Sequence, residues 1–246
     1  MASIYFDSQG ALTRIDDEGD DKAFYNNQEV PFITGTQLQN YAGTVYSESS
    51  FMGLVRQINP SDPLGEMQKE TFAIAYTMYT YAMIKNAAFK RAGRSYGLAD
   101  LLVDNNYTKG LSSPAHQQYF QQGVGDEERR KLSTMAVIRL FMRMVGDMAG
   151  VIQNLNGAAY WDGNDLFRLF PAHYRCKQGF ELSNENHGAI YQNVSVVRNP
   201  KIIQTCPATE PKVSAKRKFT FLSCVTYGGT IFFKIHDEAK SQGITW

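Results

Sequence analysis

One carboxylate, Glu48, occupies a position where the surrounding pattern predicts an apolar side chain. Apolar residues recur at helical spacing in TQLQNYAGTVYSES and define one buried stripe, which comprises Leu38, Tyr41, Ala42 and Val45. Glu48 continues this stripe three residues after Val45. A buried, unpaired carboxylate is costly when ionised, and the negative end of a helix dipole disfavours the ionised form further. We therefore predict an acid that keeps its proton near neutral pH, which is the property of a general acid.

The pattern by itself favours a simpler alternative. In that alternative the helix ends and Glu48 points into solvent, because charged side chains are mostly exposed. The sequence around Glu48 decides between the two interpretations.

The elements that must position Glu48 predict an α+β fold, mainly helical, with a small C-terminal β-hairpin or sheet. A helix begins after the N-cap Thr36 and ends near Glu48, and a long helix runs from the loop NPSDPLG to Gly93 without an internal Gly or Pro. A further helix follows the N-cap Asp126 and is stopped by NLNG. Two β-rich runs split by Tyr227-Gly228-Gly229, in KFTFLSCVTYGGTIFFKI, indicate the hairpin.

We expect a single catalytic domain, because the change from helices to strands near residue 160 has no linker-like sequence. Residues 1–35 are assigned to an N-terminal arm or small irregular layer. Residues 36–246 form the domain, with an insertion at about 172–212.

Composition excludes several functional classes. The 246 residues include 25 Lys and Arg against 24 Asp and Glu, so a net charge of +1 gives no electrostatic case for nucleic acid or an anionic membrane. The N-terminus is not typical of a signal peptide, no transmembrane segment is expected, and we predict synthesis in the cytoplasm. The four histidines lack metal-binding spacing, so we predict no metal and no cofactor. Three cysteines allow one disulfide, whose pair the sequence cannot choose.

Four blocks in order carry a resemblance to a known family: TVYSESS, KETFAIAYTMYTYAMIKNAAF, SYGLADLLVDNNYTKGL and NLNGAAYWDGNDLF. Together they resemble spore-cortex-lytic type cell wall hydrolases, in which a helix ends in a catalytic Glu, a long helix and a substrate loop follow, and a Gly-Ala-aromatic block closes the site. The Glu48-Ser49 pair is also similar to the motif of lysozyme-like lytic transglycosylases. The resemblance covers about residues 36–236. The longer loop after Glu48 and the stretch from Cys176 to Pro211 depart from the family.

The resemblance implies a lysozyme-like domain that cleaves peptidoglycan glycan strands between N-acetylmuramic acid and N-acetylglucosamine. Glu48 would be the general acid and base, assisted by Ser49 and Glu70. A transglycosylase would release a 1,6-anhydro product, whereas a muramidase would add water. The candidate second carboxylates are Asp62, Glu66, Glu70 and Asp162. Ser49 could equally bond its own backbone, and Glu70 could be a solvated residue of the first helical turn.

The resemblance also assigns substrate contacts. Tyr107 and Thr108 occupy the substrate-loop position, and Tyr160, Trp161 and Asp162 lie in the closing block. Aromatic rings offer flat faces to sugars, although a large aromatic after a helix is about as often part of the core.

Peptidoglycan lies outside the cytoplasm, so the chain would need delivery. We expect an antibacterial effector, carried by a contractile secretion machine such as a type VI secretion system, with a cognate immunity protein; phage lysis or infection is the other route. Two alternatives stay open: a non-enzymatic phage or secretion-system adaptor with a lysozyme-like fold, and a peptidoglycan amidase with a Cys176–His187 dyad.

Overall fold

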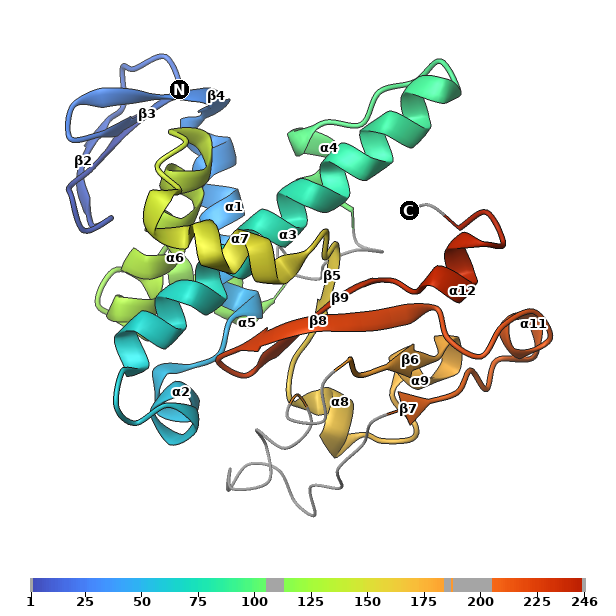
Figure 1. Ribbon diagram of the computed structural model, residues 1–246. Helices are drawn as coiled ribbons and strands as arrows, with labels where there is room; N and C mark the ends of the chain where they lie inside the picture. The colour runs from blue at the N-terminus through green and yellow to red at the C-terminus, as the bar shows by residue number, and fades with distance from the viewer. Residues whose placement is uncertain (1, 105–112, 184–186, 188–204, 245–246) are drawn as a thin grey trace.

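A computed structural model describes residues 2–104, 113–183, 187 and 205–244. The fold is α+β, as predicted: a helical body lies between an N-terminal sheet and a C-terminal sheet, with the long helix α3 (Pro63–Arg91) running across the molecule (Figure 1). The small C-terminal sheet is also as predicted.

The N-terminal segment is a regular four-stranded sheet, so the prediction of an arm or irregular layer was wrong. Its strands are β1 (Ser3–Phe6), β2 (Leu12–Asp16), β3 (Lys22–Tyr25) and β4 (Gln28–Thr34), in the order β2-β1-β3-β4. Asn26 and Asn27 both adopt positive φ, which suits a tight hairpin between β3 and β4. The apolar side chains of one face are buried in the main core, and this burial turns a short, polar segment into a stable layer.

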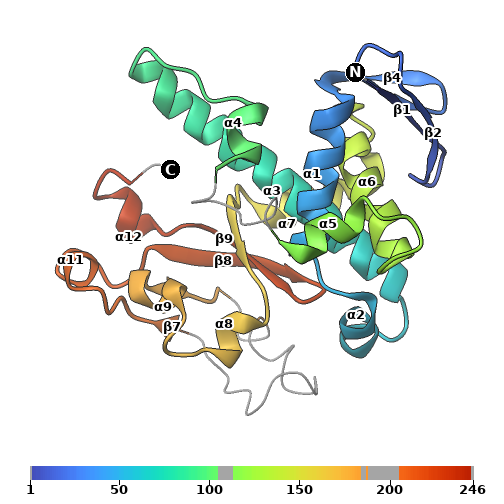
Figure 2. The ribbon, with the colours of Figure 1, turned by 180° about the vertical axis from the view of Figure 1, so that it is seen from behind.

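Helix α1 (Gly35–Glu48) packs against α3, α5 (Pro114–Tyr119) and α6 (Glu127–Phe141) and lies at the front of the helical body in the view from behind (Figure 2). The N-cap of α1 is Thr34 instead of Thr36. The Thr34 hydroxyl accepts a hydrogen bond from the Gln37 amide, and the Gln37 side chain accepts one from the Thr34 amide, which completes a capping box. Thr36 bonds Asp21 in the preceding turn.

The helix that starts at the N-cap Asp126 ends earlier than predicted. Arg143 has a φ of 57°, a left-handed conformation that stops α6 after Phe141. A short 3-10 turn, η2 (Gly146–Met148), and a separate helix α7 (Ala149–Leu155) then carry the chain to Asn156, where the predicted NLNG stop is found.

The C-terminal sheet has the order β5-β9-β8-β6-β7. Its strands are β5 (Tyr160–Asp162), β6 (Phe180–Glu181), β7 (Thr205–Cys206), β8 (Phe221–Tyr227) and β9 (Thr230–Ile235). The predicted hairpin is β8–β9, with Gly228-Gly229 as its two-residue turn. One face of the sheet joins the main core through Phe232, and the other face covers a second core that contains Ile231 and Phe233.

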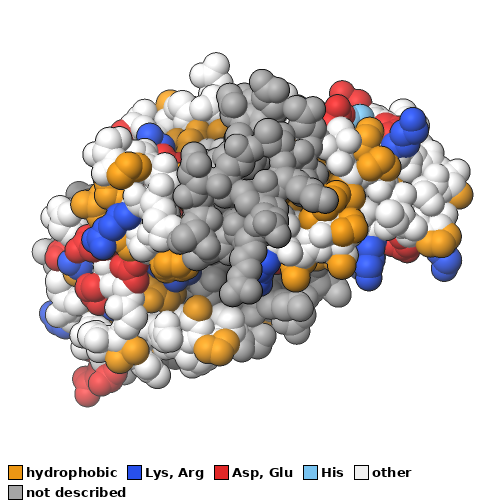
Figure 3. All heavy atoms as spheres, turned by 90° about the horizontal axis from the view of Figure 1, so that it is seen from below, with side chains coloured by type: hydrophobic (Ala, Val, Ile, Leu, Met, Phe, Trp, Pro, Cys, Tyr) orange, Lys and Arg blue, Asp and Glu red, His pale blue; other side chains and the backbone are white. Residues whose placement is uncertain are grey.

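The remaining elements are short helices, namely α2 (Met52–Ile58), α4 (Leu98–Leu102), α8 (Asp165–Arg168), α9 (Tyr174–Gln178), α11 (Pro211–Ser214) and α12 (Asp237–Lys240). Within the described ranges, none of the helices combines the length and the apolar character needed to span a bilayer. On the described part of the face seen from below, acidic and basic side chains are intermixed (Figure 3).

Candidate active site

Glu48 is the last residue of α1, and its side chain is half-buried. The indole Nε1–H of Trp161, from β5, donates a hydrogen bond to Glu48 Oε2 at 3.4 Å. The apolar stripe predicted full burial, but the helix ends at Glu48 and leaves one side of the carboxylate accessible. The predicted acid and a predicted sugar-binding aromatic, 113 residues apart in the chain, are therefore brought together.

Strand alternation separates Trp161 from its two neighbours. Side chains on a strand point to opposite faces in turn, so Tyr160 and Asp162 lie on the face away from Trp161. Asp162 is buried there, where its carboxylate accepts bonds from Arg175 Nε at 2.5 Å and from the Tyr174 hydroxyl at 2.6 Å. Of the three predicted contacts in this block, only Trp161 faces Glu48.

Tyr160 is part of the core. Its ring meets Tyr81 edge-on at 5.8 Å and Phe221 at 5.1 Å between centroids. Its main contribution is therefore to fix β5 against α3 and β8, and with β5 the position of Trp161.

Ser49 closes the end of α1. Its hydroxyl donates to the Tyr46 carbonyl at 3.2 Å and accepts a hydrogen bond from Arg129 Nε at 3.0 Å. The Ser49 carbonyl also accepts a hydrogen bond from Arg129 Nη2. Ser49 is buried, so these bonds support the structural alternative, in which it bonds its own backbone.

Arg129 is a site residue that the sequence did not reveal. It lies in the first turn of α6, is buried, and places its guanidinium 4.4 Å from the centre of the Tyr46 ring. Burial lowers its pKa, while the negative charges of Glu70, Asp126 and Glu48 raise it. The sequence DEERR did contain one signal for Arg129. A positive side chain in the first turn of a helix is opposed by the helix dipole, so it needs nearby groups that bind it.

Glu70 holds two distant segments together. Its Oε1 accepts hydrogen bonds from the hydroxyls of Ser50 and Thr230, each at 2.7 Å, and from the backbone amides of Ser50 and Gly229, each at 3.2 Å. Glu70 is fully buried, which excludes the solvated alternative and also direct contact with a sugar in this conformation. It acts as a brace between the residue after Ser49 and the β8–β9 turn.

The second carboxylate oxygen of Glu70 has an unusual environment. Oε2 is buried and has no hydrogen-bond partner among the described residues. A Cβ added at Gly228 would lie 2.4 Å from it, so only glycine fits there. Burial raises the pKa of Glu70, although hydrogen bonds from Thr230 and Ser50 and the charge of Arg129 oppose the change.

The Glu70→Gln variant tests this burial through the pH dependence of stability. Because the folded pKa is raised, this group's contribution to stability is complete below its ordinary pKa of 4.5 and is lost as the pH rises through the folded value. Relative to Glu70→Gln, the native protein should lose unfolding free energy as the pH rises toward neutrality. Each tenfold change in the acidity constant corresponds to about 1.4 kcal/mol. Urea unfolding at a series of pH values measures the difference.

Glu66→Gln is the matched control, because half-buried Glu66 lies one turn earlier on α3 and accepts the Gly228 amide at 2.7 Å. This variant should keep the pH dependence of the native protein. If the free energies of unfolding of the native protein and Glu70→Gln depended on pH in the same way, the raised pKa of a buried Glu70 would be contradicted.

The other candidate second carboxylates have structural bonds of their own. Asp62 is the N-cap of α3 and accepts the Gly65 amide at 3.0 Å, while Glu66 holds the hairpin turn. The predicted contacts Tyr107 and Thr108 lie outside the described residues.

The alternative dyad of Cys176 and His187 has other described partners. Burial raises the pKa of the Cys176 thiol, and the neighbouring Cys206 thiol raises it further. His187 Nδ1 lies 2.8 Å from the Ser223 hydroxyl, and burial lowers the pKa of this imidazole. A thiol that resists ionisation is a poor nucleophile.

No group of three His, Cys, Asp or Glu side chains in the described part of the chain could hold a metal ion. Comparison with protein-family models, with curated proteins and with solved structures finds no match to this chain. The contacts of Glu48 are therefore the basis of the functional assignment.

Proposed function

We propose that this chain cleaves the glycan strand of peptidoglycan between N-acetylmuramic acid and N-acetylglucosamine, with Glu48 as general acid and base. One observation supports this most: a half-buried carboxylate at a helix end receives a hydrogen bond from Trp161, the aromatic that the family resemblance assigns to the sugar. The indole is itself buried in the main core, so its contribution is to hold the Glu48 carboxylate in position from the core side.

The proposed reaction begins when Glu48 protonates the glycosidic oxygen, and the bond breaks through an oxocarbenium-like state. The nearby positive charge of Arg129 stabilises the carboxylate that Glu48 becomes. Glu48 then takes a proton from the attacking hydroxyl, which is the muramic acid C6 hydroxyl in transglycosylation and a water molecule in hydrolysis.

The other candidate carboxylates already form bonds within the protein, and this favours transglycosylation over hydrolysis. Asp162 is paired with Arg175 and Glu70 is buried under the hairpin turn. Because these two carboxylates are bonded or buried within the protein, the substrate's own acetamido group is better placed to stabilise the oxocarbenium-like state. We therefore propose a lytic transglycosylase that releases 1,6-anhydro products.

Trp161→Phe should lower the rate of cell wall clearing by about 3- to 10-fold, because the ring is kept but one hydrogen-bond donor to Glu48 is lost. Tyr160→Phe is the control, since this side chain is on the opposite face of β5, and it should clear cell wall at close to the native rate. Turbidity of purified sacculi follows both variants. Equal rates for Trp161→Phe and the native protein would remove the indole from the proposed site.

The products of digested sacculi test the reaction itself by mass spectrometry. Anhydro-muropeptides support the transglycosylase, and new reducing ends at N-acetylmuramic acid support the muramidase form of the proposal. Freed peptide stems would identify an amidase, and the absence of any product would identify an adaptor; either result would overturn the proposal.

We further propose delivery to the periplasm or cell wall as an antibacterial effector, with an immunity protein that binds it in the producing cell. This extends the glycosidase proposal, because the substrate lies outside the cytoplasm. Co-purification with a small protein encoded beside it, and loss of clearing in that complex, tests this partner.

A further inference from the structure

Two of the three cysteines lie together in the second core. Cys176, in α9, and Cys206, in β7, are both buried in the apolar cluster beneath the C-terminal sheet. Each thiol influences the pKa of the other, and Phe180, the ladder partner of Cys206, lies two residues after the last residue of α9. The pair joins segments that are 30 positions apart in the chain.

Backbone hydrogen bonds hold both segments in place around this pair. Cys206 is paired with Phe180 across the antiparallel β6–β7 ladder, and β6 follows α9 after a single glycine. Beyond β7, the amides of Thr209 and Glu210 donate to the Lys177 carbonyl at 3.2 and 3.0 Å. Backbone hydrogen bonds at β7 and just after it therefore hold the Cys206 segment beside α9, which carries Cys176.

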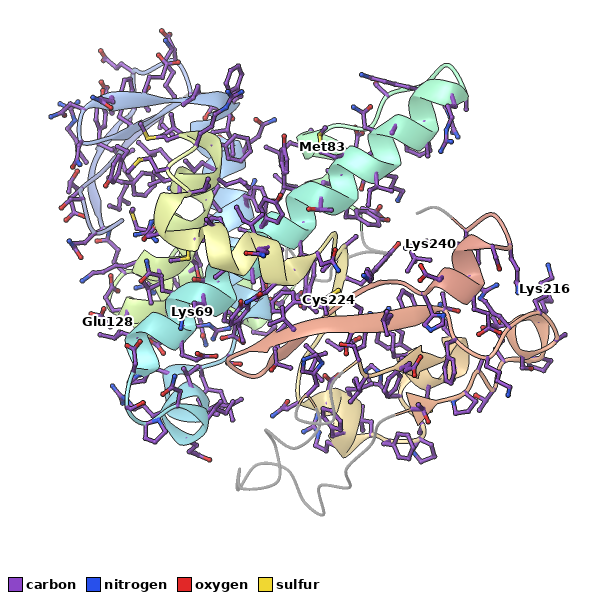
Figure 4. All side chains as sticks on the ribbon, in the orientation of Figure 1. Lys69, Met83, Glu128, Lys216, Cys224 and Lys240 are labelled. Carbon is purple, nitrogen blue, oxygen red and sulfur yellow. The ribbon has the colours of Figure 1, made fainter. Side chains whose placement is uncertain are left out.

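The third cysteine is separated from this pair. Cys224, labelled on β8 in Figure 4, packs against the main core on the other face of the sheet. Its sulfur approaches the Leu222 carbonyl at 4.0 Å. The sheet therefore lies between Cys224 and the other two thiols.

We propose that Cys176 and Cys206 form the disulfide of this chain when it folds in an oxidising environment. One thiolate attacks glutathione disulfide and releases one glutathione, and the second thiolate attacks the mixed disulfide and releases the other. The protein loses two protons and two electrons, and one glutathione disulfide becomes two molecules of glutathione.

Burial determines when this reaction takes place. It raises the pKa of both thiols, so in the folded protein they are mostly protonated and slow to exchange. The bond therefore forms during folding, before the second core closes. A chain that folds under reducing conditions keeps both thiols.

The test is refolding of the reduced full chain in glutathione disulfide and glutathione, followed by alkylation and tryptic digestion without a reductant. Cleavage places the three cysteines on separate fragments, at 176–177, 202–212 and 219–234. We expect the first two fragments to be joined and Cys224 to be alkylated. A bond that includes Cys224, or alkylation of all three thiols, would overturn the proposal.

Variants and stability give a second measurement. Oxidation should raise the melting temperature of the native chain on the order of 5–10 °C, because the bond closes a loop of about 30 residues in the unfolded chain. Cys224→Ser should show the same rise, whereas Cys206→Ala should show none. Absence of a rise in the cross-linked native chain would contradict the stabilising role. These results do not depend on cell wall cleavage, so the disulfide and the glycosidase can fail separately.

Discussion

Glu48→Gln is expected to lower the rate of peptidoglycan cleavage by about 10²- to 10⁴-fold, which is the usual contribution of a general acid. The amide keeps the shape of the side chain and an oxygen that can accept the hydrogen bond from Trp161 Nε1. It has no proton to give to the glycosidic oxygen. The rate of clearing of purified sacculi, measured at equal protein concentration, gives the effect.

Folding of the variant separates chemistry from stability. Glu48 is half-buried at a helix end, so Glu48→Gln should melt within a few degrees of the native protein. Glu128→Gln is the matched control, because Glu128 is exposed on α6, where Figure 4 labels it, and should clear sacculi at the native rate. Native clearing by Glu48→Gln would exclude Glu48 as the acid.

Arg129→Met is expected to destabilise the fold by about 3–5 kcal/mol, as is typical when one partner of a buried charge network is removed. The guanidinium binds both the carbonyl and the hydroxyl of Ser49, and its charge interacts with that of Glu70. Methionine fills much of the same space but leaves these groups without their donor. Urea unfolding gives the change in free energy.

Lys131→Met is the control on the same helix. The Lys131 ammonium lies 3.9 Å from Glu128 at the surface, and such pairs contribute about 1 kcal/mol or less. A loss below about 1 kcal/mol in Arg129→Met would show that the guanidinium does not brace the end of α1. Arg129→Met should also slow clearing, because Glu48 directly precedes Ser49 in the chain.

The elements that the sequence predicted well are those with strong local signals. The long helix α3 has no internal Gly or Pro, and the β8–β9 hairpin has a Gly-Gly turn between two β-rich runs. The N-terminal sheet was missed because its strands are short and polar on one face. Their burial comes from contact with helices later in the chain, and short apolar alternations do not reveal such contact.

The candidate site was predictable in part for the same reason. Glu48 stood out because a carboxylate interrupts an apolar stripe, and Trp161 because it lies in a distinctive aromatic block. Their contact, and that of Ser49 with Arg129, joins residues 113 and 80 positions apart. Local patterns carry no information on such pairs.

For Glu70, residue spacing alone cannot distinguish a solvated carboxylate from a buried one. Its position in the first turns of α3 is typical of a solvated acid, yet the β8–β9 turn covers it and Thr230 bonds it from 160 residues away. Asp162 follows Trp161 directly and still faces the other core, because strand side chains alternate. The sequence therefore drew attention to Glu48 and Trp161, whereas the contacts of Glu70 and Arg129 near them became visible only in the structure.

The most direct test of the account is the muropeptide profile of purified sacculi treated in parallel with the native protein and Glu48→Gln. We expect 1,6-anhydro-muropeptides with the native protein and almost none with the variant at equal protein concentration. Equal products from both proteins, or cleavage confined to the peptide stems, would contradict it.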